Sequence, residues 1–255
     1  MTIRKAVITS AGRGTRMRYI TNVLPKALLP IFENEDGTRV MVPIVNHTMR
    51  SLKSIGVEEF CVVIDSSKRS RLLQDHLKNE RVSYLKQKNP RGFGDAVLVS
   101  EEFVKGDPII LHTDDITLTG GYALLLKVFE QKDANAVFFL RKVSDPSKYG
   151  IVNASGSEKI DGHEVYKISS AEEKPGKTES NLAIVGVYAF SPKIFTALRS
   201  DHKEGVELAL TSGINTLVKA GGKVYGILMK DEQRLNVGDP DSYFKALEYT
   251  FKNSK

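Results

Sequence analysis

The residues best suited to chemistry lie in a glycine-rich segment near the start of this 255-residue chain. Residues 10–16 read SAGRGTR and directly follow an apolar run, and Lys26 comes ten residues after Arg16. A glycine-rich loop after a buried strand lets backbone N–H groups approach phosphate oxygens, while Arg and Lys supply positive charge. A dinucleotide-binding fingerprint would require a third glycine where Met17 stands, and a Walker loop would require Gly-Lys-Ser/Thr after its second glycine. The segment therefore indicates a phosphate-binding loop of another type.

Apolar runs bounded by turn residues predict buried strands at residues 6–9, 60–64, 82–85, 108–112 and 136–140. Helix-length segments with apolar residues three and four positions apart alternate with them, at residues 44–55, 70–77, 95–104 and 121–131. This alternation predicts an α/β fold with a mostly parallel sheet and helices on both faces. Ligands of such sheets bind beyond the carboxyl ends of the strands, where the glycine-rich loop and Asp114 are expected.

The pattern changes after about residue 142. Shorter strand-like pieces follow at residues 149–152, 164–170 and 182–190, then helices near 193–198 and 207–219, a strand at 223–228 and a last helix at 240–251. We interpret the chain as one continuous domain over residues 1–255, whose C-terminal third holds a smaller antiparallel elaboration. The polar insert at residues 33–39 is expected to be an exposed loop with a turn at Asp36 and Gly37.

Composition and charge exclude several classes of protein. The longest uncharged stretch, residues 180–192, is 13 residues long, against the roughly 20 apolar residues that a membrane span requires, and no signal peptide is recognisable. The single Cys61 allows no disulfide framework or cysteine metal site, so a reducing cytoplasm is expected. The five histidines lack the spacing of a zinc site or a catalytic triad. The net charge of +6 weakly favours anionic partners, but the basic cluster Lys68, Arg69 and Arg71 is too short to support nucleic-acid binding.

Seven groups of short motifs occur in one order and together resemble the sugar-1-phosphate nucleotidylyltransferases. They are AGRGTR (11–16) with PK (25–26) and LP (29–30), QKNPRGFGDAV (87–97), DDI (114–116), YGIV (149–152), EKP (173–175), NLAIVGVY (181–188) and LNVG (235–238). The resemblance covers nearly the whole chain. It implies a Rossmann-like nucleotidyltransferase fold, in which a mixed, mostly parallel central sheet flanked by helices carries a small antiparallel sugar-binding elaboration. The nucleotide-binding part would span about residues 1–142, and the sugar-phosphate-binding part about residues 143–255.

The same resemblance implies an enzyme in which the phosphate of a sugar 1-phosphate attacks the α-phosphorus of a nucleoside triphosphate. The implied substrates are UTP and glucose 1-phosphate, giving UDP-glucose and pyrophosphate, with dTTP or another sugar 1-phosphate as the alternative and Mg²⁺ as the cofactor. A homodimer or homotetramer is implied as well, although the insert at 33–39 and the short stretch 75–87 depart from the family where relatives shape their assembly. A non-catalytic regulatory relative with the same fold is the rival hypothesis. The residues that argue against it are Arg16, Lys26, Asp114 and Lys174.

Transfer of the family's roles assigns the nucleotide to Ala11, Gly12, Gly14, Thr15, Arg16, Gln87 and Gly92. The backbone of residues 12–15 and the side chain of Arg16 would hold the β- and γ-phosphates. Lys26 would reach the α-phosphate and its transition state, where a cation offsets the developing charge. Gln87, with Gly92 nearby and the backbone of the loop opposite, would present its amide to O4 and N3–H of uracil or thymine.

The acceptor residues implied by the resemblance are Gly150, Glu173, Lys174 and Val185. Gly150 would allow close contact between the backbone and the sugar, and Glu173 would bind sugar hydroxyls. Lys174 would bind the sugar phosphate, and Val185 would line the sugar. Arg16, Lys26 and Lys174 are thus the implied catalytic cations.

Asp114 and Asn236 are the implied ligands of Mg²⁺. A carboxylate at the end of a strand suits a metal ion that bridges phosphates. The family has Gly or Pro where this chain has Thr113, and an Asp where it has Asn236. An amide oxygen can bind Mg²⁺ but brings no negative charge, so Asp115 or Asp239 is the alternative source of the second oxygen.

Overall fold

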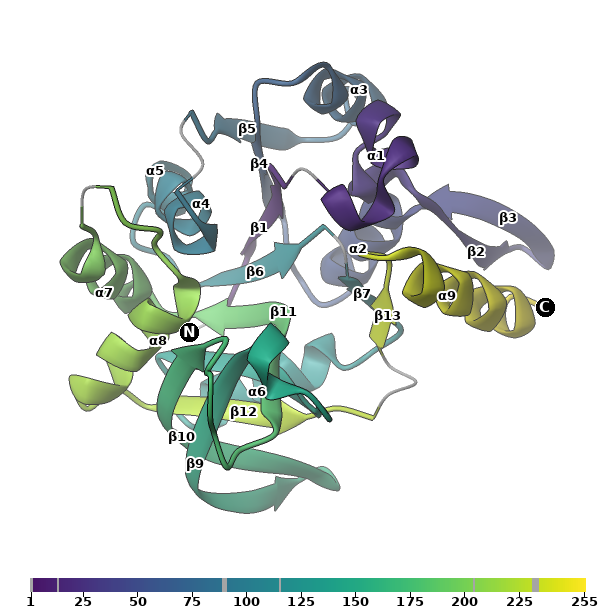
Figure 1. Ribbon diagram of the computed structural model, residues 1–255. Coiled ribbons are helices and arrows are strands. Elements are labelled where there is room, and N and C mark those ends of the chain that lie inside the picture. Colours follow the sequence, from purple (N-terminus) through teal and green to yellow (C-terminus); the bar gives the residue numbers. More distant parts are fainter. Residues whose placement is uncertain (1, 13, 89–90, 115, 204, 231–233) are drawn as a thin grey trace.

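One large sheet runs through the centre of the molecule (Figure 1). The computed structural model describes residues 2–12, 14–88, 91–114, 116–203, 205–230 and 234–255. Within these ranges, nine strands form the sheet in the order β5-β4-β1-β6-β11-β8-β12-β10-β9. Their bounds are β1 (Lys5–Ser10), β4 (Glu59–Ile64), β5 (Val82–Lys86), β6 (Ile109–Thr113), β8 (Ala136–Lys142), β9 (Gly150–Ile160), β10 (His163–Glu173), β11 (Leu182–Phe190) and β12 (Val224–Leu228).

The five strands predicted from the apolar runs all form, and β5, β4, β1 and β6 are parallel to one another. The strands β1, β4 and β6 are sandwiched between two layers of side chains, whereas β5 at the edge of the sheet is only partly buried. In β1, for example, Ala6 and Ile8 belong to one core cluster, while Val7 belongs to the cluster on the opposite face. Parallel strands covered on both faces are apolar along their whole length, which is why the sequence pattern located them.

Helices cover both faces of the sheet (Figure 1). The helices α2 (Ile44–Lys53), α3 (Lys68–His76) and α6 (Tyr122–Gln131) pack on one face, and α4 (Phe93–Val99), α5 (Glu101–Val104), α7 (Lys193–Asp201) and α8 (Leu210–Lys219) on the other. The single helix predicted over residues 95–104 is wrong, because α4 and α5 are separate. Ser100 lies at the break, and its Oγ donates to the carbonyl of Val97 at 2.6 Å; such side-chain bonds compete with helical backbone bonds.

The C-terminal strands extend the same sheet rather than form a second layer. β11 lies between β6 and β8 and is antiparallel to both, and β10 is antiparallel to β12 and β9. The predicted α/β class, with a mixed central sheet flanked by helices, is confirmed. No helix within the described ranges has the length and apolar character needed to cross a membrane.

The polar insert at residues 33–39 is part of a β-hairpin, so the predicted loop is wrong. The hairpin pairs β2 (Pro30–Glu35) with β3 (Thr38–Pro43) in antiparallel register. The predicted turn is present, because Asp36 and Gly37 both have positive φ, 51° and 79°, as two-residue hairpin turns require. Exposed residues on both faces of the hairpin tip gave no alternating pattern to recognise.

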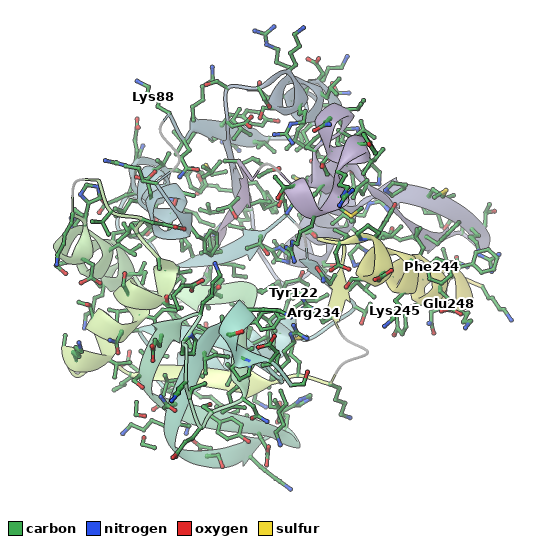
Figure 2. The ribbon with its side chains drawn as sticks, viewed as in Figure 1. Lys88, Tyr122, Arg234, Phe244, Lys245 and Glu248 are labelled. Atoms are coloured by element: carbon green, nitrogen blue, oxygen red, sulfur yellow. The ribbon has the colours of Figure 1, made fainter. Side chains whose placement is uncertain are left out.

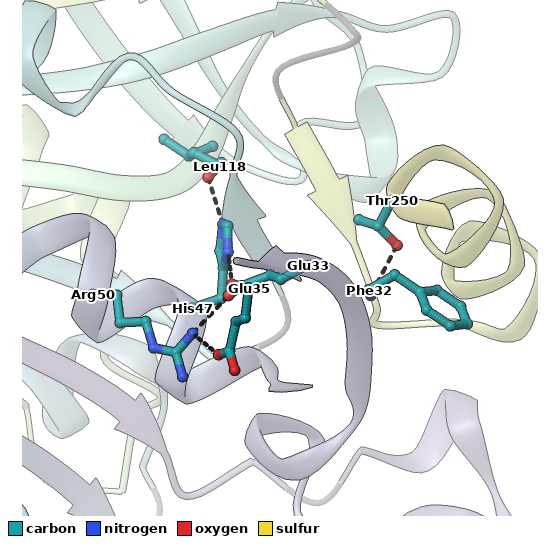
Figure 3. Close-up of polar contacts among 7 residues, drawn as sticks. All are labelled: Phe32, Glu33, Glu35, His47, Arg50, Leu118 and Thr250. Atoms are coloured by element: carbon teal, nitrogen blue, oxygen red, sulfur yellow. Dashed lines mark hydrogen bonds and ion pairs between the residues drawn. The ribbon is translucent and has the colours of Figure 1, made fainter. Parts of the chain in front are cut away.

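Two elements hold the hairpin. On one side, Glu33 and Glu35 bind Arg50 of α2 at 2.8 and 2.7 Å, and Glu33 also bonds the ring of His47 (Figure 3). Nε2 of the same histidine donates to the carbonyl of Leu118 at 3.1 Å. Leu118 ends β7 (Ile116–Leu118), which pairs with β13 (Arg234–Asn236).

On the other side, the last helix, α9 (Pro240–Asn253), packs along β2. Tyr243 Oη donates to the carbonyl of Pro30 at 2.8 Å. The N–H of Phe32 donates to Thr250 Oγ1 at 3.2 Å (Figure 3). The end of the chain therefore supports the segment that directly follows Lys26.

Candidate active site

The segments that follow the four parallel strands meet at one edge of the sheet. Together they line a cavity of about 650 Å³, which we call the strand-end cavity. Its lining includes Ala11, Gly12, Lys26, Gln87, Gly92 and Asp114. Four of the seven predicted nucleotide residues thus share a cavity with the predicted catalytic lysine and the predicted metal ligand.

A buried ion pair lies in the wall of this cavity. Lys26 Nζ is 3.2 Å from Asp114 Oδ1, and the two residues are 8% and 7% exposed. Ser10 Oγ donates to Asp114 Oδ2 at 2.7 Å. The short 3₁₀ helix η2 (Lys26–Leu28), which follows the extended Pro25, carries the lysine toward the end of β6. Both charges are therefore held in place at the strand ends.

Gln87 is held by two acceptors. Its Nε2 donates to the carbonyl of Gly92 at 3.2 Å and to Asp95 Oδ2 at 2.9 Å. Arg91 in turn donates to Asp95 Oδ1 at 2.9 Å. Both hydrogens of the Gln87 amide group are directed to these acceptors, and the amide oxygen is the atom that remains for a ligand.

The rest of the glycine-rich loop is placed differently. Gly14 has φ +66°, and a Cβ there would lie 2.8 Å from Thr21 Cγ2, so the loop requires glycine at this position. Thr15 begins η1 (Thr15–Met17). Thr15 and Arg18 line a separate surface hollow, and neither residue lines the strand-end cavity. Arg16 lines two further cavities instead of the strand-end cavity.

The first of these, of about 390 Å³, lies against β11, and we call it the β11 cavity. Gly150 and Glu173, both predicted to contact the sugar, line it. Glu173 Oε2 accepts a hydrogen bond from Thr211 Oγ1 at 3.2 Å. A Cβ at position 150 would lie 2.7 Å from Thr211 Cγ2, so Gly150 permits the close approach of α8 to this wall.

The structure corrects the prediction that Val185 lines this cavity. Val185 is 1% exposed and packs in the core on the other face of the sheet. Its neighbours Ile184 and Gly186 line the cavity. Successive side chains of a strand point to opposite faces, so a motif that spans β11 contributes every second residue.

The second cavity, of about 740 Å³, is rich in positive charge, and we call it the cationic cavity. Its basic lining residues are Arg16, Arg141, Lys148, Lys174 and Arg234. Only Arg16 and Lys174 were predicted. Arg141 comes from β8, Lys148 from the 3₁₀ helix η3 (Pro146–Lys148) and Arg234 from β13. Of these three, only Lys148 could have been suspected from the sequence, because it adjoins the YGIV motif.

The three cavities adjoin. Thr113 and Phe93 line both the strand-end and β11 cavities, and Arg16 and Lys148 line both the β11 and cationic cavities. Figure 2 shows Lys88 beyond the end of β5 and Arg234 on β13, near α9. The lining residues therefore come from elements spread across the whole sheet.

The two predicted metal ligands lie in different cavities. Asp114 lines the strand-end cavity, where its hard carboxylate oxygens suit Mg²⁺. Asn236 lines the cationic cavity, and its Oδ1 accepts a hydrogen bond from the N–H of Gly238 at 3.0 Å. Asp115 lies outside the described residues. Within the described ranges, no three His, Cys, Asp or Glu residues form a cluster that could hold a metal ion.

Asp239 is a carboxylate in contact with Asn236, because Asn236 Nδ2 donates to Asp239 Oδ2 at 3.2 Å. Burial raises the pKa of the Asp239 carboxyl. The pKa nevertheless lies below the usual value for Asp, because hydrogen bonds from Ser242 and Asn236 and the charge of Arg16 stabilise the carboxylate. Its other oxygen accepts the N–H of Ser242 at 2.9 Å and caps α9. Asp239 therefore places a negative charge beside Arg16.

Residues 5–253 match the family described as nucleotidyl transferase. The chain is 30% identical to the UTP–glucose-1-phosphate uridylyltransferase of Mycoplasma genitalium, over 99% of this chain and 93% of that protein. It is also 30% identical to the protein of the same name from Streptococcus pneumoniae, over 98% of this chain and 91% of that protein.

Solved structures show the same similarity. A crystal structure of UDP-glucose pyrophosphorylase complexed with UDP-glucose superposes with a TM-score of 0.81 at 25% identity, covering 98% of this chain and 99% of that one. A UTP-bound UGPase from Acinetobacter baumannii superposes with a TM-score of 0.77 at 25% identity, covering 97% and 93%.

Proposed function

Because the chain belongs to the nucleotidyl transferase family, as its motifs predicted, we propose that it transfers the uridylyl group of UTP to glucose 1-phosphate. The products are UDP-glucose and pyrophosphate. One observation carries the proposal: the Lys26–Asp114 ion pair lies in the strand-end cavity, beside Gln87. This cavity shares two lining residues, Thr113 and Phe93, with the β11 cavity, which Gly150 and Glu173 line. A nucleotide and a sugar bound in these two cavities would meet beside Lys26.

The chemistry requires positive charge. A phosphate oxygen of glucose 1-phosphate forms a bond to the α-phosphorus of UTP, and the bond from that phosphorus to the bridging oxygen breaks as pyrophosphate leaves. Both partners are anions, so the protein contributes mainly positioning and cations at the charge that develops. Lys26, already ordered and buried, would act at the α-phosphate.

The β- and γ-phosphates would contact the backbone of Gly12 and Gly14, with Arg16 as their cation. Arg16 lines the cationic cavity together with Lys174, which we assign to the phosphate of the sugar. Arg141, Lys148 and Arg234 add positive charge to the same cavity. This concentration of positive charge would favour binding of two phosphorylated substrates and lower their mutual repulsion.

The uracil base would lie by Gln87 and Gly92, with the backbone at Ala11 and Gly12 opposite. Thymine presents the same O4 and N3–H, so dTTP is the alternative donor. The sugar would lie in the β11 cavity, with its hydroxyl groups toward Glu173 and its ring close to the backbone of Gly150.

We also propose that the reaction uses Mg²⁺, held by Asp114 together with phosphate oxygens of the nucleotide. Such an ion would neutralise phosphate charge. Asn236 stays a predicted second ligand, although its amide oxygen already accepts a hydrogen bond from the N–H of Gly238.

The nucleotide-binding part would be about residues 1–142 and the sugar-phosphate-binding part about residues 143–255. We also propose that the chain acts in the cytoplasm as a homo-oligomer.

The test is pyrophosphate release by the purified protein over a matrix of UTP, dTTP, CTP, ATP and GTP against several sugar 1-phosphates with Mg²⁺. We expect the highest kcat/KM with UTP and glucose 1-phosphate. A preference for dTTP would favour the alternative donor. No pyrophosphate from any pair would refute the enzyme and favour a regulatory relative.

A further inference from the structure

We infer that Asp95 is a positioning residue that determines which way the amide of Gln87 faces and thereby makes the strand-end cavity select uracil or thymine over cytosine. The inference rests on the proposed function, in which the base lies beside Gln87. Asp95 itself touches no substrate in this arrangement and acts through Gln87.

The orientation of the Gln87 amide follows from its neighbours. Its Nε2 lies 3.2 Å from the carbonyl oxygen of Gly92 and 2.9 Å from Asp95 Oδ2. A carbonyl and a carboxylate can only accept hydrogen bonds, so the NH₂ end of the amide must face them. The buried amide therefore offers its Oε1, an acceptor, to a base in the cavity.

Asp95 is well held for this task. It lies in the first turn of α4, where the positive end of the helix dipole favours a carboxylate. It is 4% exposed, and its second oxygen accepts from Arg91 at 2.9 Å. With one oxygen toward Arg91 and the other toward Gln87, the carboxylate presents an acceptor in both directions.

An acceptor at Oε1 distinguishes the pyrimidines. Uracil and thymine carry a hydrogen on N3 and donate it to Oε1. Cytosine has a lone pair on N3, so two acceptors would face each other beside the buried Gln87 amide. A site built on hydrogen bonds rejects such an analogue because polar groups are left unpaired.

Asp95→Asn tests this directly, because it keeps the size of the side chain and replaces one acceptor by a donor. Arg91 only donates, so it would take the oxygen of Asn, and the new NH₂ would face Gln87. The Gln87 amide would then lie between an acceptor at Gly92 and a donor at residue 95, so its orientation is no longer fixed and the form that presents its NH₂ to the base becomes populated. We expect the ratio of kcat/KM for UTP to that for CTP, at fixed glucose 1-phosphate, to fall roughly tenfold to a hundredfold.

Arg91→Met is the matched control. It removes the ion pair between Arg91 and Asp95, in which the Arg91 side chain is partly exposed. It keeps the Asp95 carboxylate that faces Gln87. We expect the UTP-to-CTP ratio to stay within roughly threefold of that of the wild type. A loss of selectivity in Arg91→Met as large as in Asp95→Asn would overturn the inference, because the ion pair and not the acceptor would then matter.

If Asp95→Asn fails to fold, as judged by circular dichroism, Asp95→Ala replaces it. Alanine suits the first turn of a helix and leaves Gln87 with Gly92 alone, so the ratio should again fall. An unchanged ratio in a folded variant, while the wild type turns over UTP, overturns the role of Asp95 and leaves the proposed function intact. A wild type that uses no pyrimidine nucleotide refutes the proposed function itself, and this inference with it.

Discussion

Lys26 is a buried lysine at the end of the central strands, 3.2 Å from Asp114. We expect Lys26→Met, which keeps most of the side-chain volume, to lower kcat roughly 10² to 10³-fold, because a preorganised cation is lost from the transition state. The measurement is pyrophosphate release at saturating substrates, with Lys159→Met on exposed β9 as the control. Thermal unfolding must accompany it, since Asp114 also loses a cationic neighbour. A kcat close to that of the wild type would contradict the role.

Lys174 differs from Lys26 in its exposure, 61% for the side chain, and lies 3.5 Å from Glu173. We expect Lys174→Ala to raise the KM for glucose 1-phosphate roughly tenfold or more, as expected for a lost hydrogen bond between charged groups. Some loss of kcat should accompany it, because the bound phosphate is also the nucleophile. Lys177→Ala, three residues further on and exposed, is the control. If only the KM for UTP rose, Lys174 would bind UTP and not the sugar phosphate, which would contradict this assignment.

At the scale of secondary-structure elements, β6 and β11 touch where the strand-end and β11 cavities share a wall. A Cβ at Gly186 would lie 2.3 Å from Thr113 Oγ1. We expect Gly186→Ala to destabilise the fold by about 1–3 kcal/mol through overpacking, and much less in a Thr113→Gly background, where the space is free. Urea unfolding of the four proteins measures this coupling. Equal costs in both backgrounds would show that the contact is unimportant.

The hairpin of β2 and β3 depends on charged contacts with α2 (Figure 3). The pKa of Glu33 lies below its ordinary value chiefly because His47 donates a hydrogen bond to it; burial opposes this, and the charges of His47 and Arg50 add to it. A pKa lowered by folding gives stability that is present above the unfolded pKa and is lost as the pH falls through the folded pKa.

We therefore expect Glu33→Gln to be less stable than the wild type at pH values above the ordinary glutamate pKa. The difference should shrink as the pH falls below that value, because the unfolded chain is protonated first, and it should vanish below the lowered pKa of Glu33 in the folded protein. Urea unfolding over a series of pH values measures it. A difference that grows in acid would contradict the assignment.

At the scale of the whole molecule, the last helix completes the N-terminal part of the site. Ala246 of α9 packs in one cluster with Leu29, Ile31 and Val42, which follow Lys26 in the chain. We expect removal of residues 239–255 to lower the Tm strongly and to lower kcat, because this cluster would be exposed to water. Tyr243→Phe, which removes only the bond to Pro30, should cost about 1 kcal/mol. A truncated protein with unchanged Tm would show that α9 is dispensable.

The sequence by itself determined the elements and residues whose signals are local. Strands buried on both faces are continuous apolar runs, and the glycine-rich loop, Lys26, Gln87 and Asp114 follow or adjoin such runs. Because the carboxyl ends of parallel strands lie at one edge of the sheet, the strand pattern predicted that the glycine-rich loop and Asp114 would meet there. Lys26 and Gln87 were assigned to the same site by the motifs of the family. The order of the motifs likewise predicted the family.

Only the tertiary structure decided which residues meet across the sheet. The position of β11 between β6 and β8 puts Ile184 and Gly186, and not Val185, toward the β11 cavity. It also brings Arg141, Lys148 and Arg234 from separate elements into one cationic cavity. These contacts join residues far apart in the chain, and they depend on strand order and packing, which no short pattern of residue types records.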